Sequence, residues 1–499
     1  MANPGASEPA WVPPYYFKSV EPSSREYDTE RSRPWSQTCW TSAASYVQPM
    51  IETKFAPLID WIVEENAVFA IRGCGRSPNP GFSSAEKTAL VIHMQPMYYS
   101  KRWRDPPTND NSPHSLKDGS TMKVVAGATW GEVYSFLEEH GLCAMGARDP
   151  NVGVDGFLLG GGYPIFPNLH GTGADCVKTF EIVGVVNSSR AQLIKVGGDT
   201  RASDQDRDLC KLFQALKGGG SNFGLLTAVD IAVFPKFDVE YTINEYRIDD
   251  YANILKAITR AQEAMEADYR LNVITTFHPD FVQLCLLFAK LPVSSSGSQG
   301  HRELEPIYAL KSRIRTVKQE AKGTILSLAQ AMADSNKPMR RTIGTVTTKV
   351  RYDLYLEVYN AWHGIVKKLP KGIVLRFTIQ PVSPKCVKDG KLWGGNIMGL
   401  EEVSQCWWAF TAEWQLESDD ELAQQAINDL VAATRNAAKK EDLLLDYLCM
   451  NFANASQDVL NSYGKDNVDT MREMAKKFDP KRVFQDLQND GFLLRKIEE

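Results

Sequence analysis

The first half of the chain alternates apolar stretches with glycine-rich turns. Apolar residues recur at helical spacing over residues 54–66, which predicts an amphipathic helix. Residues 67–75 predict a buried strand that leads into a glycine-rich loop, and residues 89–94 predict a second buried strand. Residues 122–141 predict a strand, a turn and a helix that ends at Gly141.

Four more segments complete this half. Residues 178–196 alternate apolar and polar positions, which predicts a hairpin with its turn at 187–189. Residues 208–235 predict a helix, a glycine break and a strand. Residues 98–120 are polar and turn-rich, so they predict a long surface loop. Residues 1–35 are rich in Pro, Ser and Glu and predict an arm that wraps the surface.

The second half of the chain has a different pattern, with less glycine and longer helical repeats. Long helices are predicted at 251–268 and 421–442, and a helix near 471–484 is expected to stop close to Pro480. Strand-like runs lie between the long helices, at residues 272–279, 281–289, 372–382 and 406–416. Helices packed on one face of an antiparallel sheet would fit this pattern, so we expect an α+β fold.

Length and charge narrow the class of protein. A chain of 499 residues is long for one hydrophobic core, which favours two lobes. The net charge is -5 and no run of Lys and Arg stands out, which argues against a nucleic-acid partner. We find no run of about 18 apolar residues and therefore expect no membrane span. Nothing in the chain indicates an obligate protein partner.

Cysteine and histidine usage bears on location and on metal binding. The nine cysteines are scattered, form no CxxC pair and follow an N-terminus without a secretory signal pattern. We therefore expect reduced thiols in a cytoplasmic protein. The seven histidines show neither HxxxH nor HxH spacing, so we expect no metal site.

Four glycine-rich stretches in the first half carry the candidate chemistry. Glycine lets backbone N–H groups approach a ligand, and successive N–H groups can form an anion-binding nest. Tight turns between strands are the alternative explanation for any single stretch. None of the four is a GxGxxG after a strand or a GxxxxGK[ST] loop, so neither a Rossmann nor a P-loop site is supported. The stretches are RGCGRSPNPG, GATWGE, VGVDGFLLGGGYP and KGGGSNFG.

The order of these motifs resembles that of the berberine bridge enzyme-like FAD-linked oxidases, specifically their fungal secondary-metabolism branch. The similarity runs from about residue 40 to the C-terminus and includes AIRGCGRSPNPGF, GATWGEVY, VGVDGFLLGGG, HGTGADCVKTFEIV, LFQALKGGGSNFGLLT, GGNIMGL and MNFANASQD. The resemblance implies a two-lobed PCMH/VAO-type FAD-binding fold with an antiparallel sheet in the substrate lobe. The FAD lobe would comprise residues 36–235 and 430–499, and the substrate lobe residues 236–429.

The resemblance also implies which residues hold FAD. Loops near 72–77, 127–131, 146–156 and 160–162 would cradle the cofactor, with Val183 beside the adenine and Asn451 near the isoalloxazine. The implied cofactor-binding residues are Arg72, Gly73, Cys74, Gly75, Arg76, Ser77, Gly127, Gly146, Gly153, Gly156, Gly160, Gly161, Val183 and Asn451.

The sequence departs from the family pattern at three chemically important places. The family's flavin-linking His is replaced by Arg76, and the Cys of bicovalent members by Arg148, so any FAD is expected to bind noncovalently. Asp155 stands where the family has Gly; it either faces the phosphates, where Arg76 could offset its charge, or points to solvent. Cys449 replaces the usual catalytic Tyr and is either a base or inert packing.

Three functions remain open on this basis. The first is a noncovalent FAD oxidoreductase that acts on a small apolar natural-product intermediate. The second is a non-redox isomerase or cyclase on the same scaffold, with FAD absent or only structural and with His170, Asp155, Arg76 and Tyr163 as acid/base candidates. The third is a non-catalytic binding protein. Cys449 is the further candidate base in the redox enzyme.

Overall fold

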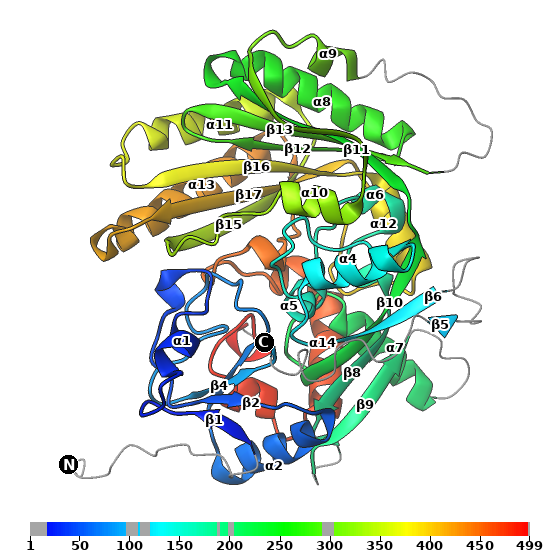
Figure 1. The fold of residues 1–499 in the computed structure, drawn as a ribbon, viewed down its shortest axis with the longest axis vertical. Coiled ribbons are helices and arrows are strands. Elements are labelled where there is room, and N and C mark those ends of the chain that lie inside the picture. The colour runs from blue at the N-terminus through cyan, green and yellow to red at the C-terminus, as the bar shows by residue number, and fades with distance from the viewer. Residues whose placement is uncertain are drawn as a thin grey trace.

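The computed structural model describes residues 17–95, 108–109, 120–186, 190–197, 204–291 and 304–497. These residues form two lobes, stacked one above the other in Figure 1. Most of the surface loop predicted at 98–120, and the turn predicted at 187–189, lie outside the described residues.

A four-stranded sheet forms one part of the first lobe. Its order is β1-β2-β4-β3, with β2 (Tyr46–Gln48), β3 (Phe69–Arg72) and β4 (Leu90–His93) parallel and β1 (Lys18–Val20) antiparallel to β2. The amphipathic helix predicted at 54–66 is confirmed as α2 (Phe55–Glu65), whose apolar face is buried.

The N-terminal segment corrects one prediction. Residues from Lys18 onward do not form a surface arm, because β1 joins the sheet and α1 (Tyr27–Arg31) buries Glu30. This segment is rich in charged residues and proline and lacks the apolar alternation that predicts a strand. It is a strand because it pairs with β2.

A second, antiparallel sheet completes the first lobe. Its strand order is β5-β6-β10-β8-β9, and β7 also pairs with β10. The strands are β5 (Thr108–Asn109), β6 (Ser120–Val125), β7 (Leu142–Cys143), β8 (Val177–Gly184), β9 (Gln192–Gly197) and β10 (Leu225–Pro235). Pairing of β8 with β9 confirms the predicted hairpin. Helix α4 (Trp130–Glu139) begins at a capping box formed by Thr129 and Glu132.

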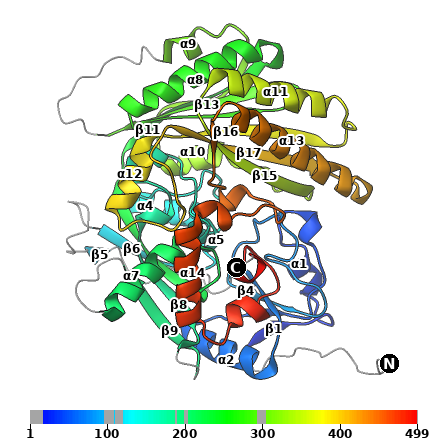
Figure 2. The ribbon, with the colours of Figure 1, turned by 180° about the vertical axis from the view of Figure 1, so that it is seen from behind.

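Two helices from distant parts of the chain cover this lobe. Helix α7 (Asp204–Leu216) packs beside α14 (Lys465–Phe478), as Figure 2 shows from behind. The helix predicted to stop near Pro480 is therefore confirmed in the C-terminal segment.

The second lobe is built on an eight-stranded antiparallel sheet. Its order is β14-β11-β13-β12-β16-β17-β15-β18. The strands are β11 (Asp238–Arg247), β12 (Leu271–Phe277), β13 (Phe281–Lys290), β14 (Arg313–Gly323), β15 (Arg340–Lys349), β16 (Val374–Val382), β17 (Gln405–Trp414) and β18 (Leu444–Leu445). Helices α8 (Tyr251–Ala267), α11 (Tyr352–Val366) and α13 (Asp420–Lys440) lie on one face of this sheet (Figure 1). The predicted α+β fold with a helix-covered sheet is confirmed.

The two-residue period of the strands separates the faces of this sheet. Phe277, Phe377 and Phe410 pack into the core beneath the helices. Thr276 and Thr378, their neighbours in sequence, line a cavity on the opposite face instead. The sheet therefore has one face for packing and one face for a ligand.

One predicted boundary also changes. Residue 430 falls inside α13, which packs on the large sheet, and β18 is the last strand of that sheet. The chain therefore returns to the first lobe only after Leu445. Within the described ranges, no helix has both the length and the apolar character that a membrane crossing needs.

Candidate active site

A cavity of about 600 Å³ lies between the glycine loops of the first lobe and the open face of the large sheet. The loop side includes residues 73–79, 147–149, 152–153, 155–157, 159–160 and 450–453. The sheet side presents residues from five strands: Ile274, Thr276, Gln283, Cys285, Ile343, Arg376, Thr378, Ala409 and Thr411. The cavity thus has a backbone-rich wall and a side-chain wall.

The loop that follows β3 carries a row of free backbone donors. Among the described residues, no acceptor receives a hydrogen bond from the N–H groups of residues 73–77, which all line the cavity. Gly75 has a φ of 69°, and its carbonyl accepts a hydrogen bond of 3.0 Å from the Trp35 N–H. Free N–H groups in succession form a nest that suits an anion, because such donors otherwise find partners.

Arg72 fixes the start of this loop and points away from the large cavity. Its Nη1 donates to the Glu30 carbonyl at 2.8 Å, and its Nη2 lies 3.4 Å from the Glu30 carboxylate. Burial would raise the pKa of Glu30, but the hydrogen bond from His93 and the nearby arginines hold that pKa at about 2. Arg72 is therefore a positioning residue and does not line the large cavity.

Arg76 forms its ion pair with Asp149 and not with Asp155. Its Nη2 bonds the Asp149 carboxylate, its Nη1 donates to Asn336 at 2.8 Å, and its guanidinium lies 4.8 Å from the Trp35 ring centroid. Asp149 stands 73 positions away in sequence. Arg76 therefore does not pair with Asp155 to offset its charge, as the sequence analysis suggested it could.

Asp155 lies beside the nest, in the first turn of α5 (Val154–Leu159). A Cβ atom on Gly73 would lie 2.1 Å from its Oδ2, so the missing side chain of Gly73 makes room for this carboxyl. The Gly156 N–H donates to Oδ1 at 2.8 Å, and no ion pair involves Asp155 in the described part of the chain. Burial raises its pKa. At 9% exposure, Asp155 does not point to solvent.

Asn451 clamps the glycine-rich segment after α5. Its Nδ2 donates to the Gly156 carbonyl at 3.0 Å, and its Oδ1 accepts from the Gly162 N–H at 2.9 Å. A Cβ on Gly160 would lie 2.3 Å from the same amide, so only glycine fits there. Asn451 therefore both lines the cavity and holds its wall.

Of the four predicted catalytic residues, two line the cavity and two do not. Asp155 and Tyr163 line it, and the Tyr163 hydroxyl donates to the Pro381 carbonyl at 3.0 Å. His170 instead stacks on Phe234 at 3.8 Å, where burial lowers its pKa to about 3. Cys449 is fully buried in the core, where burial raises its pKa to about 12. The structure therefore does not bring His170 and Cys449 to the cavity that Asp155 and Tyr163 line.

Apart from Arg72, the predicted cofactor-binding residues also divide into two groups. Those that line the cavity are Gly73, Cys74, Gly75, Arg76, Ser77, Gly153, Gly156, Gly160 and Asn451. Four others serve packing: Gly127 against Met94, Gly146 against Trp130, Gly161 against Met398, and Val183 in the core with Leu225. Glycine motifs alone did not separate these two roles.

Sequence reasoning did not single out His278 or Arg376, and it named Arg148 only as the residue in place of a flavin-linking Cys. Arg148 donates through Nη1 to the Gln380 side chain, 232 positions away. His278 stands at the end of β12, where burial lowers its pKa to about 4, so its imidazole is neutral near pH 7. No local motif marks His278 or Arg376 as a cavity residue, because only the fold brings their strands to the glycine loops.

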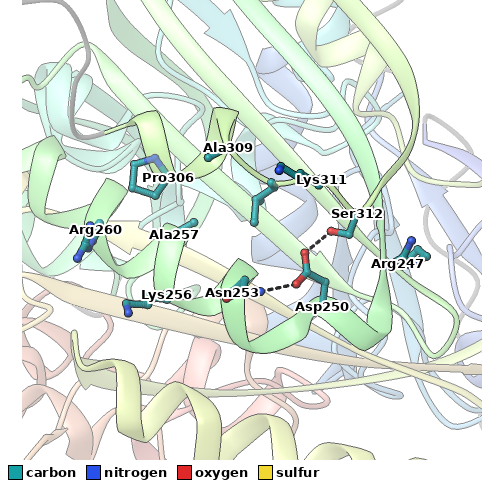
Figure 3. Close-up of a pocket in the computed structure, with 11 residues that line it drawn as sticks. Arg247, Asp250, Asn253, Lys256, Ala257, Arg260, Pro306, Ala309, Lys311 and Ser312 are labelled. Carbon is teal, nitrogen blue, oxygen red and sulfur yellow. Dashed lines mark hydrogen bonds between the residues drawn. The ribbon is translucent and has the colours of Figure 1, made fainter.

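A second cavity, of about 540 Å³, lies on the outside of the sheet lobe (Figure 3). Asp250 at its base accepts hydrogen bonds from Asn253 and Ser312, and Lys256, Arg260 and Lys311 surround it. None of the glycine loops contributes to it. The first cavity, with its nest, is therefore the candidate active site.

Comparison with known proteins agrees with this assignment. Residues 43–185 match the FAD binding domain family model. An FAD-dependent monooxygenase of Arthrobotrys oligospora is 29% identical over 459 residues, 92% of this chain and 84% of that protein. The FAD-dependent monooxygenase macF of Penicillium terrestre is 28% identical over 481 residues, 95% and 86% of the two chains.

Solved structures share the same fold at low sequence identity. The 6-hydroxy-D-nicotine oxidase of Arthrobacter nicotinovorans matches with a TM-score of 0.72 at 16% identity, covering 97% of this chain and 100% of the other. The berberine bridge enzyme-like 1 protein of Physcomitrella patens matches with a TM-score of 0.70 at 14% identity, covering 95% and 97%.

The cavity fits the cofactor that these comparisons imply. Free N–H groups at residues 73–77 suit a diphosphate, and the missing Cβ atoms of Gly153 and Gly160 let the backbone approach a ligand. Asp155 is the group that disfavours the diphosphate charge, and its raised pKa reduces that cost. Residues 43–185 are therefore similar to an FAD binding domain, the chain as a whole has the two-lobed PCMH-type fold of these solved structures, and fungal FAD-dependent monooxygenases are among its homologues.

Proposed function

We propose that this protein is an FAD-dependent oxidoreductase that holds FAD noncovalently and acts on a small intermediate of fungal secondary metabolism. The observation that carries the proposal is the nest of free N–H groups at residues 73–77, opposite a sheet face that can hold a second molecule. The names of the homologous fungal FAD-dependent monooxygenases support the reaction class.

Noncovalent binding follows from the side chains at the two attachment positions of the resembling family. Arg76 stands at one and is held by Asp149, and Arg148 stands at the other. A guanidinium remains protonated and is a poor nucleophile. Neither arginine is therefore expected to form a covalent bond to a carbon atom of the flavin. Binding energy would come instead from backbone donors and from the loops that Asn451 fixes.

The chemistry divides between cofactor and protein. When bound, FAD supplies a two-electron acceptor that oxygen can regenerate. The N–H groups of residues 73–77 would hold its diphosphate, and the open face of the large sheet would hold the substrate. His278, which is neutral near pH 7 because burial lowers its pKa to about 4, can accept a hydrogen bond from a substrate hydroxyl. Tyr163 stays neutral because burial raises its pKa, so it serves as a donor and an orienting group.

Asp155 favours one alternative, a non-redox isomerase or cyclase on the same scaffold. A carboxyl at the nest opposes a diphosphate when ionised, and a buried carboxyl of raised pKa can act as a general acid. Asp155, Tyr163 and Arg76 would then be the acid/base groups within the cavity.

Oxygen consumption distinguishes these two functions. The purified protein, reconstituted with FAD, would be incubated in air with a panel of phenolic and enolic polyketide acids while oxygen and products are followed. Product formation with matching oxygen uptake supports the oxidoreductase. Product formation without oxygen uptake, unchanged when FAD is left out, would overturn it in favour of the isomerase or cyclase.

A further inference from the structure

Arg148 lies where the two lobes meet. Its side chain reaches from the loop between β7 and α5 to β16, where Nη1 donates to the Gln380 side chain. The guanidinium lies 5.8 Å from the ring centroid of Tyr163 and 5.6 Å from that of Phe452. Arg148 therefore occupies the side of the cavity that faces the sheet, and not the nest at residues 73–77.

Arg148 forms no ion pair in the described part of the chain, although the carboxylates of Asp149 and Asp334 are near enough to favour its charge. The other two arginines that line the cavity are paired: Arg76 with Asp149, and Arg376 with Glu413 at 3.0 Å. Arg148 has only the neutral Gln380 amide as a hydrogen-bond acceptor among the described residues. Burial lowers its pKa, which shows that the charge is poorly solvated there. Several guanidinium N–H donors thus remain available to a ligand.

The surroundings of Arg148 suit a flat, largely apolar ligand. Tyr163 and Phe452 flank the guanidinium, while Ile274 and Cys285 belong to the sheet wall opposite. Thr276 on the same wall supplies a hydroxyl but no charge. An oxyanion on such a ligand would gain charge-assisted hydrogen bonds that water cannot easily replace.

We propose that Arg148 binds an acidic oxygen of the substrate, so that the substrate is a planar, mostly apolar molecule carrying a carboxylate, a phenolate or an enolate. This role of Arg148 rests on the proposed function, because that function places the substrate against the open face of the large sheet. An anionic oxygen of FAD would bind to Arg148 in the same way as an anionic oxygen of the substrate. The experiment therefore has to distinguish binding of the cofactor from binding of the substrate.

The test uses 2-naphthoate and 2-naphthamide, two probes of nearly equal shape that differ in charge. Binding of each to the full chain, with and without saturating FAD, would be measured by calorimetry for wild type, R148Q and R148K. R148Q keeps a hydrogen-bonding amide but is shorter and removes the charge, and R148K keeps the charge but loses the planar, bidentate arrangement of donors. R260Q, on the outer cavity, is the control. Thermal melting checks that each variant is folded.

Wild type and R260Q are expected to bind 2-naphthoate about 10- to 100-fold more tightly than 2-naphthamide. R148Q should lose this preference, R148K should keep part of it, and FAD affinity should stay within about threefold of wild type in all of them. Equal binding of the two probes to wild type, or an unchanged preference in R148Q, overturns the proposal.

A second outcome would assign Arg148 to the cofactor. If folded R148Q loses FAD affinity tenfold or more, the assignment to substrate is overturned, whatever the probes show. Failure of the proposed function is seen separately: wild type that binds no FAD contradicts the oxidoreductase, while the probe titration of the FAD-free chain still decides the role of Arg148.

Discussion

At the scale of single residues, Asp155 most changes what the cavity can hold. Its carboxyl fills the space above Gly73, beside five free N–H groups. At about 5 Å, an ionised carboxylate and a phosphate charge would repel by roughly 3 kcal/mol at an effective dielectric constant near 20. A neutral carboxyl avoids this repulsion. Because burial raises the pKa of Asp155, FAD binding should be coupled to a proton.

FAD affinity should therefore fall as pH rises. Below the raised pKa, Asp155 is neutral and tolerates the diphosphate; above it, the carboxylate repels the diphosphate. Arg76 and Asp149 also lie near the nest, and their side chains form an ion pair with each other. Flavin fluorescence titrations at a series of pH values from about pH 4, near the ordinary pKa of an aspartate, upward should show FAD affinity weakening by up to about 100-fold in wild type.

The variant D155N carries no ionisable group at this position and is the matched comparison. It should bind FAD with little dependence on pH and more tightly than wild type at high pH. D250N, in the outer cavity, should behave as wild type. If wild type and D155N give the same flat profile, Asp155 does not face the diphosphate.

At the scale of elements, the glycines of the four loops serve two purposes. Gly73, Gly153 and Gly160 line the cavity, whereas Gly127 allows a close approach of the backbone at Met94. Gly127 has a φ of 89°, and a Cβ there would lie 2.4 Å from the Met94 carbonyl oxygen. Both the backbone conformation and the lack of space therefore require glycine.

Substitution by alanine should separate such sites from ordinary helix positions. G127A should lower the free energy of unfolding by at least about 2 kcal/mol, through strain and overpacking. Gly364 lies within α11 and has open space around its Cβ position, so G364A should raise stability by about 0.5–1 kcal/mol. Urea unfolding followed by circular dichroism measures both. Equal effects of the two changes would contradict this assignment.

Elements with a clear apolar period could be predicted from the sequence, and elements without one could not. Helices α2 and α8 and the β8–β9 hairpin follow their patterns. Strand β14 does not, because nine of its eleven residues are exposed and most of its side chains are charged or polar. It is a strand only because it pairs with β11 at the sheet edge.

The candidate site was predicted less completely from the sequence than the fold. The glycine-rich loops predicted an anionic ligand, and most of the glycines near residues 73–77 and 153–160 line the cavity. The partners of Arg76 and Arg148 lie 73 and 232 positions away, and no local signal links such pairs. Tertiary packing likewise removes His170 from the site, because its ring stacks on Phe234.

At the scale of the whole molecule, the cavity exists because the two lobes are held together. Arg341 of β15 is fully buried and joins them: its Nε bonds Glu413 at 2.7 Å, and its Nη1 donates to the Trp35 carbonyl of the first lobe. Its guanidinium also lies 4.3 Å from the Trp35 ring centroid. A buried arginine with this many partners is costly to remove, because each partner is left unsatisfied.

R341Q should therefore weaken the joint between lobes. The free energy of unfolding should fall by about 3–5 kcal/mol, since Glu413 and the carbonyl groups lose a buried donor. Urea unfolding followed by tryptophan fluorescence measures the change. R260Q, an exposed arginine on α8, should alter stability by less than about 0.5 kcal/mol. A loss no larger in R341Q than in R260Q would show that Arg341 does not hold the lobes.

The central claim is that this fold holds FAD at the nest without a covalent bond. The most direct measurement is the visible absorbance spectrum of the purified protein, reconstituted with FAD, before and after acid precipitation. The account predicts flavin absorbance in the folded protein and complete release of the colour into the acid supernatant. Colour that remains in the pellet would contradict noncovalent binding, and a protein that takes up no FAD would contradict the claim itself.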